Sequence, residues 1–162
     1  MTTEAIAATG GLQLEVQYAC ADTALPAEQD FARWVQAVPG IGGHAVELVV
    51  RVVDEAESRA LNKRYRGKDR PTNVLSFPFE APPGVDCNHL GDIVICAAVV
   101  KREARQQHKP EQDHWAHMVV HGVLHLQGYD HQDDVQAEAM ETLEKQVLQG
   151  LGIGDPYQNE RR

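Results

Sequence analysis

Histidines are the residues best suited to chemistry in this sequence, because five of the eight lie between His114 and His131. On a helix, residues four apart lie on one face, about 6 Å from each other. His121 and His125 can therefore direct both imidazoles at one metal ion. The spacing predicts two of the ligands of a metal site.

The third ligand must come from beyond the helix, because a straight helix cannot bring a further residue back to the same ion. Gly128 lies three residues after His125 and can adopt the left-handed conformation that ends a helix. The reversed chain can then bring His131 to the ion. Three histidines with a fourth position open to water are typical of catalytic zinc, so we predict one Zn²⁺ per chain, held by His121, His125 and His131.

His117 lies on the same helix face but is expected outside the ligand set. It is eight residues from His125, which is about 12 Å along the helix axis. His117 or His114 could lie behind the ligands, face a phosphate group, or be satisfied by hydrogen bonds. Two other hypotheses are core histidines without a metal and a structural zinc site. The lack of a nearby cysteine argues against the structural site.

The histidine spacing H-x-x-x-H-x-x-G-x-x-H matches that of metzincin proteases. Those enzymes carry glutamate directly after the first histidine as the general base, whereas this chain has Gly122. A zinc peptidase therefore stays an alternative rather than the first hypothesis. We expect Gly122 to leave room beside the metal for a bulky anionic substrate. Asp130 could place a carboxylate near the metal or cap the turn.

One segment of this acidic chain is strongly basic. The sequence has 15 basic and 24 acidic residues and a net charge of −9, which argues against nucleic-acid affinity over the whole surface. Six of the basic residues nevertheless fall within twelve positions, opposed only by Asp69. These six are Arg59, Lys63, Arg64, Arg66, Lys68 and Arg70.

Arg66 is the best-placed catalytic candidate in this segment. A phosphodiester under attack gains negative charge, which a guanidinium group stabilises with paired hydrogen bonds. Arg66 ends a predicted helix, and the polar loop 67–73 that follows could face the metal cleft. Lys68, Arg70 and Asn73 in the loop, together with His117, are the candidate substrate-binding residues. The other basic residues could equally form a solvated helix face.

Alternating and helical patterns predict the elements that position these residues. Asp54 with Glu57 resembles a capping box, and Gly67 suits the end of the helix that follows. The last helix is expected to bury a stripe formed by Val135, Ala139, Leu143, Val147 and Leu151, and residues 155–162 are expected to fray. Strands are predicted at 12–18, 45–53, 73–79 and 90–96, and helices between Pro26 and Pro39 and at 55–66, 97–109, 111–126 and 135–151.

These elements predict a single α+β (α/β-type) domain over residues 1–162. A small mixed sheet of about four strands would be covered by about five helices, with the zinc site on the penultimate helix and the turn after it. The three cysteines form no CxxC pair, and there is no secretory signal or membrane span, so we expect a reducing, cytoplasmic location.

Two uninterrupted motifs resemble the YbeY family. One is the histidine segment 121–131, HGVLHLQGYDH, and the other joins YRGKD at 65–69 to PTNVLSFP at 71–78. Residues 90–93, LGDI, and 114–117, HWAH, extend the similarity, which covers about residues 45 to 157. The first 40 residues carry no recognisable motif.

The resemblance implies a zinc-dependent, single-strand-specific endoribonuclease that acts in rRNA processing, notably 16S rRNA 3′ end maturation, and in ribosome quality control. It implies that His121, His125 and His131 bind zinc and that Arg66 is the functional arginine. The expected partners are single-stranded rRNA, the small ribosomal subunit and assembly proteins, with no membrane or DNA. The alternatives are a zinc peptidase and a non-catalytic ribosome-assembly factor with structural zinc. The nucleophile could be water or the ribose 2′-hydroxyl.

Overall fold

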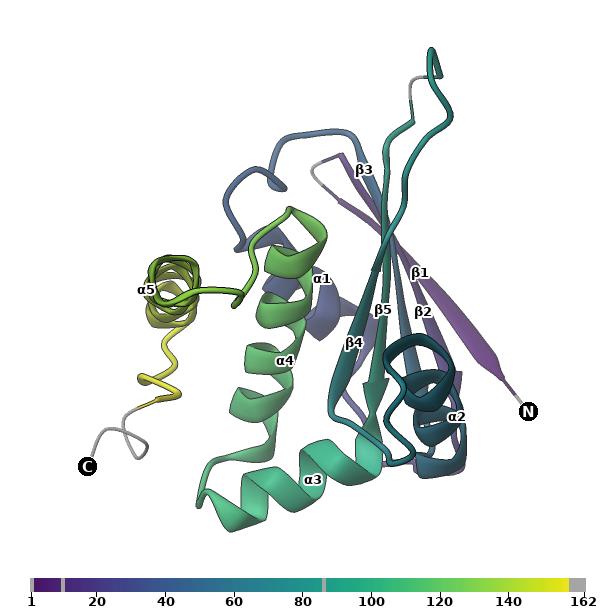
Figure 1. Cartoon of the computed structure of the whole chain (residues 1–162), viewed down its shortest axis with the longest axis vertical. Helices are drawn as coiled ribbons and strands as arrows, with labels where there is room; N and C mark the ends of the chain where they lie inside the picture. Colours follow the sequence, from purple (N-terminus) through teal and green to yellow (C-terminus); the bar gives the residue numbers. More distant parts are fainter. Residues whose placement is uncertain (1, 10, 86, 158–162) are drawn as a thin grey trace.

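The computed structural model describes residues 2–9, 11–85 and 87–157, which form one small α+β domain (Figure 1). The predicted alternation of strands and helices, with helices accumulating late, is confirmed. The strands are β1 (Thr3–Thr9), β2 (Leu12–Ala19), β3 (Val46–Val53), β4 (Val74–Pro78) and β5 (His89–Cys96). The helices are α1 (Glu28–Gln36), α2 (Glu55–Arg66), α3 (Ala97–Gln106), α4 (Glu111–Leu126) and α5 (Asp134–Gly150).

The strands form one mixed sheet in the order β1-β2-β3-β5-β4. β2, β3 and β5 are parallel, whereas β1 and β4 pair antiparallel to their neighbours. The sheet has five strands rather than about four, because β1 was not predicted. Its sequence TEAIAAT lacks an alternating apolar face, and Ile6 is 67 % exposed. β1 is therefore an edge strand defined by its backbone pairing with β2 rather than by burial.

Helices cover the two sheet faces unequally. In Figure 1, α1 and α4 lie on one face, α5 lies on the outer side of α4, and α2 lies on the opposite face. The main core fills the space between the sheet and the α1 and α4 layer, where Phe31 makes edge contacts with Trp34 and Trp115. A smaller cluster around Leu75 lies on the other face, with Leu61 of α2 packed against it. Helix α4 thus occupies the middle layer between the sheet and α5.

Both ends of α2 form as predicted. The Asp54 side chain accepts a hydrogen bond from Glu57 N at 2.9 Å, and Gly67 adopts the left-handed conformation with φ 71°. Two buried polar residues of the helix then fix the loop after it. Ser58 Oγ hydrogen-bonds both the carbonyl and the amide of Thr72, and Asn62 Nδ2 donates to Arg70 O. These bonds hold loop 67–73 in place beside β4.

The predicted apolar stripe of α5 is wrong at its start, where Val135 is 78 % exposed. Each step of four residues advances about 40° around a helix, so a series of such steps leaves the buried face. The side chains that α5 buries are Met140, Glu144, Val147 and Leu148.

Within the segment that was expected to fray, Pro156 is buried and Tyr157 is partly buried. Residues 158–162 lie outside the described part. The three cysteines are free, and Cys96 is buried. Within the described residues, no helix is both long and apolar enough to span a bilayer.

Gly91 provides a test of the packing between β4, β5 and α4. Its φ is +152°, and an added Cβ would lie 2.5 Å from Phe77 O and 2.7 Å from Leu126 Cδ2. We expect Gly91→Ala to lower the free energy of unfolding by about 3 kcal/mol in urea titrations, because backbone must move. Gly150→Ala is the control, since nothing lies within 4 Å of its added Cβ. An equal, small effect of the two substitutions would contradict this packing.

Candidate metal centre

Helix α4 lies unusually close to the sheet at Gly122. An added Cβ there would be 3.0 Å from Ile93 Cγ2, and Ser76 Oγ donates a hydrogen bond to Gly122 O at 3.1 Å. The expectation that Gly122 leaves room for a substrate is therefore wrong. Because Gly122 has no side chain, α4 packs closely on β4 and β5. This close packing brings residues of β4 and of α4 to the same pocket.

The chain reverses direction directly after α4, as the glycine predicted. Gly128 has φ 102°, its amide donates to His125 O at 3.0 Å, and the amide of Tyr129 donates to Leu124 O at 3.1 Å. Asp130 Oδ1 then accepts a hydrogen bond from the amide of His131 at 2.7 Å. This turn carries His131 back alongside the helix.

The structure brings His121, His125 and His131 together. One nitrogen of each ring lies within 4.8 Å of the others, and the Nε2 atoms of His121 and His125 are 3.0 Å apart. The ring centroid of His131 is 5.1 Å from each of the other two centroids. Nitrogen ligands of a tetrahedral zinc ion, with bonds of 2.0–2.1 Å, are about 3.3 Å apart. The three imidazoles are therefore close enough to hold one metal ion.

The protonation state of His125 also fits a metal ligand. Burial lowers its pKa, and the neighbouring His121 and His131 lower it further, to about 4. His125 is thus neutral near pH 7, with a lone pair available to a metal.

A buried carboxylate lies behind this cluster. Glu144 of α5 is 0 % exposed, and its oxygens accept hydrogen bonds from His121 Nδ1 at 2.7 Å, His117 Nε2 at 2.9 Å and the Tyr157 hydroxyl at 2.6 Å. Burial alone would raise the pKa of Glu144, but the hydrogen bonds from His117 and His121 outweigh it and hold that pKa far below its usual range. Glu144 is therefore ionised and acts as an acceptor for all three donors.

Sequence reasoning missed Glu144. Glu144 is one of three glutamates in α5, a residue type that normally indicates the solvent face of a helix, and only the position of α5 over α4 shows that this one points inward. His117, His121 and Glu144 also lie close enough to form a second candidate metal triad. In the structure they are joined by hydrogen bonds.

A pocket of about 220 Å³ opens in front of the histidine cluster. Arg66 reaches it from the end of α2, Asn73 and Ser76 line it from β4 and the preceding loop, and Asp130 lines it from the turn. Of the predicted substrate-binding residues, Asn73 lines this pocket, whereas Lys68 and Arg70 are exposed on the neighbouring loop. The pocket is lined by Arg66, Thr72, Asn73, Val74, Ser76, His121, His125, Asp130 and His131.

His117 is not brought to the pocket, because it is 7 % exposed and bonded to Glu144. His114, one turn earlier, makes an analogous contact with Glu103 of α3 at 2.9 Å. Burial raises the pKa of Glu103, but hydrogen bonds from His114 and Asn73 outweigh this and lower it. Glu103 thus ties Asn73, beside the pocket, to α4.

A family model described as Endoribonuclease YbeY matches residues 17–152. The chain belongs to the YbeY family. A protein of Alkalilimnicola ehrlichii named Endoribonuclease YbeY is 62 % identical over 160 residues, which is 96 % of each chain. A solution structure of a Thermotoga maritima protein is 29 % identical, with a TM-score of 0.47, over 77 % of this chain and 81 % of that one.

Removing one imidazole tests the metal centre of this YbeY-family chain. We expect His125→Ala to weaken zinc binding roughly 100-fold or more, measured by competition with a chromophoric chelator, because two ligands remain. His44→Ala removes an exposed histidine outside the cluster and should leave zinc affinity unchanged. Equal zinc affinity of the two variants would show that the ion binds elsewhere.

Proposed function

We propose that this chain is a zinc-dependent, single-strand-specific endoribonuclease that acts in rRNA processing, including 16S rRNA 3′ end maturation, and in ribosome quality control in the cytoplasm. The observation that carries the proposal is that Arg66 and the three imidazoles line the same pocket. The relative from Alkalilimnicola ehrlichii bears the name of an endoribonuclease. Site and relationship therefore support the same kind of reaction.

Arg66 is the residue that would hold the scissile phosphate. Its side chain is exposed at the pocket, and in the described part of the chain no carboxylate forms an ion pair with it. By contrast, Arg59 of the same helix is paired with Asp69 at 2.7 Å. The guanidinium of Arg66 is thus available for paired hydrogen bonds to phosphate oxygens, which strengthen as negative charge develops.

The other pocket residues have supporting parts. A bound zinc ion would act as a Lewis acid and lower the pKa of a coordinated water. Asn73 lines the pocket and is held by hydrogen bonds to Glu103 and from the amide of Val74. Asp130 is the carboxylate among the lining residues, which suits proton transfer to or from the reacting groups.

A concave site favours single strands, because a flexible strand can bring one phosphate into it and a rigid duplex cannot bend to follow. The net charge of −9 limits attraction to RNA elsewhere on the surface. We therefore propose that small-subunit and assembly proteins bring the enzyme to its rRNA, since a local tether raises the effective concentration of weakly bound RNA.

The packing at Gly122 argues against the peptidase alternative. The general base of metzincins would occupy this position, whereas this chain has Gly122, where even an added Cβ would lie only 3.0 Å from Ile93 Cγ2. The position therefore cannot supply the carboxylate that peptide hydrolysis needs.

The cleavage assay uses purified protein, zinc and a single-stranded rRNA fragment. We expect Arg66→Ala to lower kcat/KM by about 100- to 1,000-fold, because transition-state charge loses its partner. Arg66→Lys should be intermediate, since an ammonium group keeps the charge but not the paired hydrogen bonds. Cyclic phosphate ends on the product would identify the 2′-hydroxyl as the nucleophile.

Arg105→Ala is the control, because it removes an exposed arginine of α3 outside the pocket. Its cleavage rate should equal that of the unmodified protein. Undiminished cleavage by both Arg66→Ala and His125→Ala would contradict the ribonuclease proposal. Hydrolysis of casein in place of RNA would favour the peptidase, and zinc binding without either activity would favour the assembly factor.

A further inference from the structure

We infer that Glu144, fixed by His117 and Tyr157, is a positioning residue that makes His121 present its Nε2 atom to the metal. This inference rests on the metal centre of the proposed function, and it concerns residues outside the three ligands. It assigns a role to α5 and to the C-terminal segment 153–157, neither of which lines the pocket.

The burial of Glu144 is the first step in the argument. An ionised carboxylate without solvent contact is unfavourable unless hydrogen bonds replace its hydration, and an apolar residue would suit this position between α4 and α5 better. The protein instead surrounds the carboxylate with three donors, from α4 and from the C-terminal segment. The three donors converge on one acceptor, so the arrangement fixes both the carboxylate and the side chains that bond to it.

The second step concerns the two nitrogens of His121. Glu144 Oε2 already accepts from His117 and Tyr157, and Glu144 Oε1 lies 2.7 Å from His121 Nδ1, so the carboxylate is the acceptor and His121 donates from Nδ1. In a neutral imidazole the other nitrogen, Nε2, then carries the lone pair. His121 Nε2 lies 3.0 Å from His125 Nε2, on the side of the candidate zinc site. Glu144 thus selects the tautomer and the ring orientation that a ligand needs.

The third step is that the carboxylate itself cannot rotate. Its second oxygen, Oε2, accepts hydrogen bonds from His117 Nε2 at 2.9 Å and from the Tyr157 hydroxyl at 2.6 Å. The rings of His117 and Tyr157 also make an edge contact, with centroids 5.5 Å apart. Both oxygens of Glu144 therefore accept hydrogen bonds, and the donors come from α4 and from the C-terminal segment.

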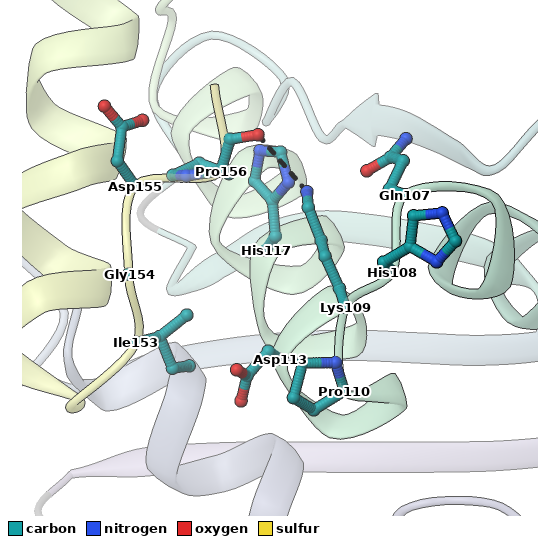
Figure 2. Close-up of a pocket in the computed structure, with 10 residues that line it drawn as sticks. All are labelled: Gln107, His108, Lys109, Pro110, Asp113, His117, Ile153, Gly154, Asp155 and Pro156. Atoms are coloured by element: carbon teal, nitrogen blue, oxygen red, sulfur yellow. Dashed lines mark hydrogen bonds between the residues drawn. The ribbon is translucent and has the colours of Figure 1, made fainter. Parts of the chain in front are cut away.

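The C-terminal segment is itself held by α5 and by the connection between α3 and α4. Ile153 N donates to Leu148 O of α5 at 2.8 Å, Pro156 is buried, and Lys109 Nζ of the connection donates to Pro156 O at 3.3 Å. Figure 2 shows Lys109 reaching across to Pro156 beside the ring of His117. These contacts keep the Tyr157 hydroxyl at Glu144, so the segment supports the metal centre from behind.

The test measures zinc affinity by chelator competition, together with ¹⁵N NMR of the His121 ring in the protein with and without zinc. We expect Glu144→Leu to weaken zinc binding by about 10- to 100-fold, while urea titrations show that the metal-free protein stays folded. Glu144→Gln should lose less, because its amide oxygen can still accept from Nδ1. Tyr157→Phe should lose less than Glu144→Leu. Glu138→Gln, at an exposed position of the same helix, is the control.

The NMR signal separates positioning from mere structural support. In the zinc-loaded, unmodified protein we expect zinc on His121 Nε2 and a proton on Nδ1. Without zinc, the unmodified protein should keep the proton on Nδ1, whereas Glu144→Leu should populate both tautomers and make the two ring nitrogens less distinct. Unchanged zinc affinity in folded Glu144→Leu would overturn the inference. Zinc on His121 Nδ1 would also overturn it, because the ion would then occupy the triad with His117 and Glu144. If Glu144→Leu does not fold, Glu144→Gln and Tyr157→Phe decide by the same two measurements.

No measurement in this test involves RNA. An inactive protein that binds zinc with the expected dependence on Glu144 would leave the inference standing and remove the ribonuclease proposal. If the unmodified protein bound no zinc, the metal centre and this inference would fail together.

Discussion

Three imidazoles have to point at one spot, and a regular helix can supply only two of them. His121 and His125 share a face of α4, but the next residue on that face lies too far along the axis. The left-handed Gly128 ends the helix and the turn at Asp130 returns His131 to the cluster. The position of the pocket, and the need to hold α4 rigidly, follow from this geometric constraint.

Two buried or partly buried carboxylates meet the need for rigidity. Glu144 connects α4 to α5, and Glu103 connects α4 to α3 and to Asn73 beside the pocket. From the opposite side of β4, the end of α2 brings Arg66 to the same opening. The close contact of α4 with the sheet at Gly122 brings these two parts together. The position of Arg66 relative to the three histidines thus depends on the packing of α4 against the sheet at Gly122.

The sequence predicted features that local rules determine. Helix α2 with its cap, the break at Gly128 and the clustering of His121, His125 and His131 follow from spacing and from glycine conformations. Features that depend on tertiary packing were missed. β1 is defined by strand pairing, Gly122 packs against a strand distant in sequence, and Glu144 is buried only because α5 lies on α4. The local sequence does not reveal whether a polar residue of a helix faces the core or the solvent.

X-ray absorption spectroscopy of the zinc-loaded protein tests the central claim most directly, because it reports the atoms bound to the ion. The account predicts three histidine nitrogens at about 2.0–2.1 Å and one oxygen that a soluble anion can replace. A fourth ligand from the protein, or fewer than three imidazoles, would show a closed or different site and would contradict the account.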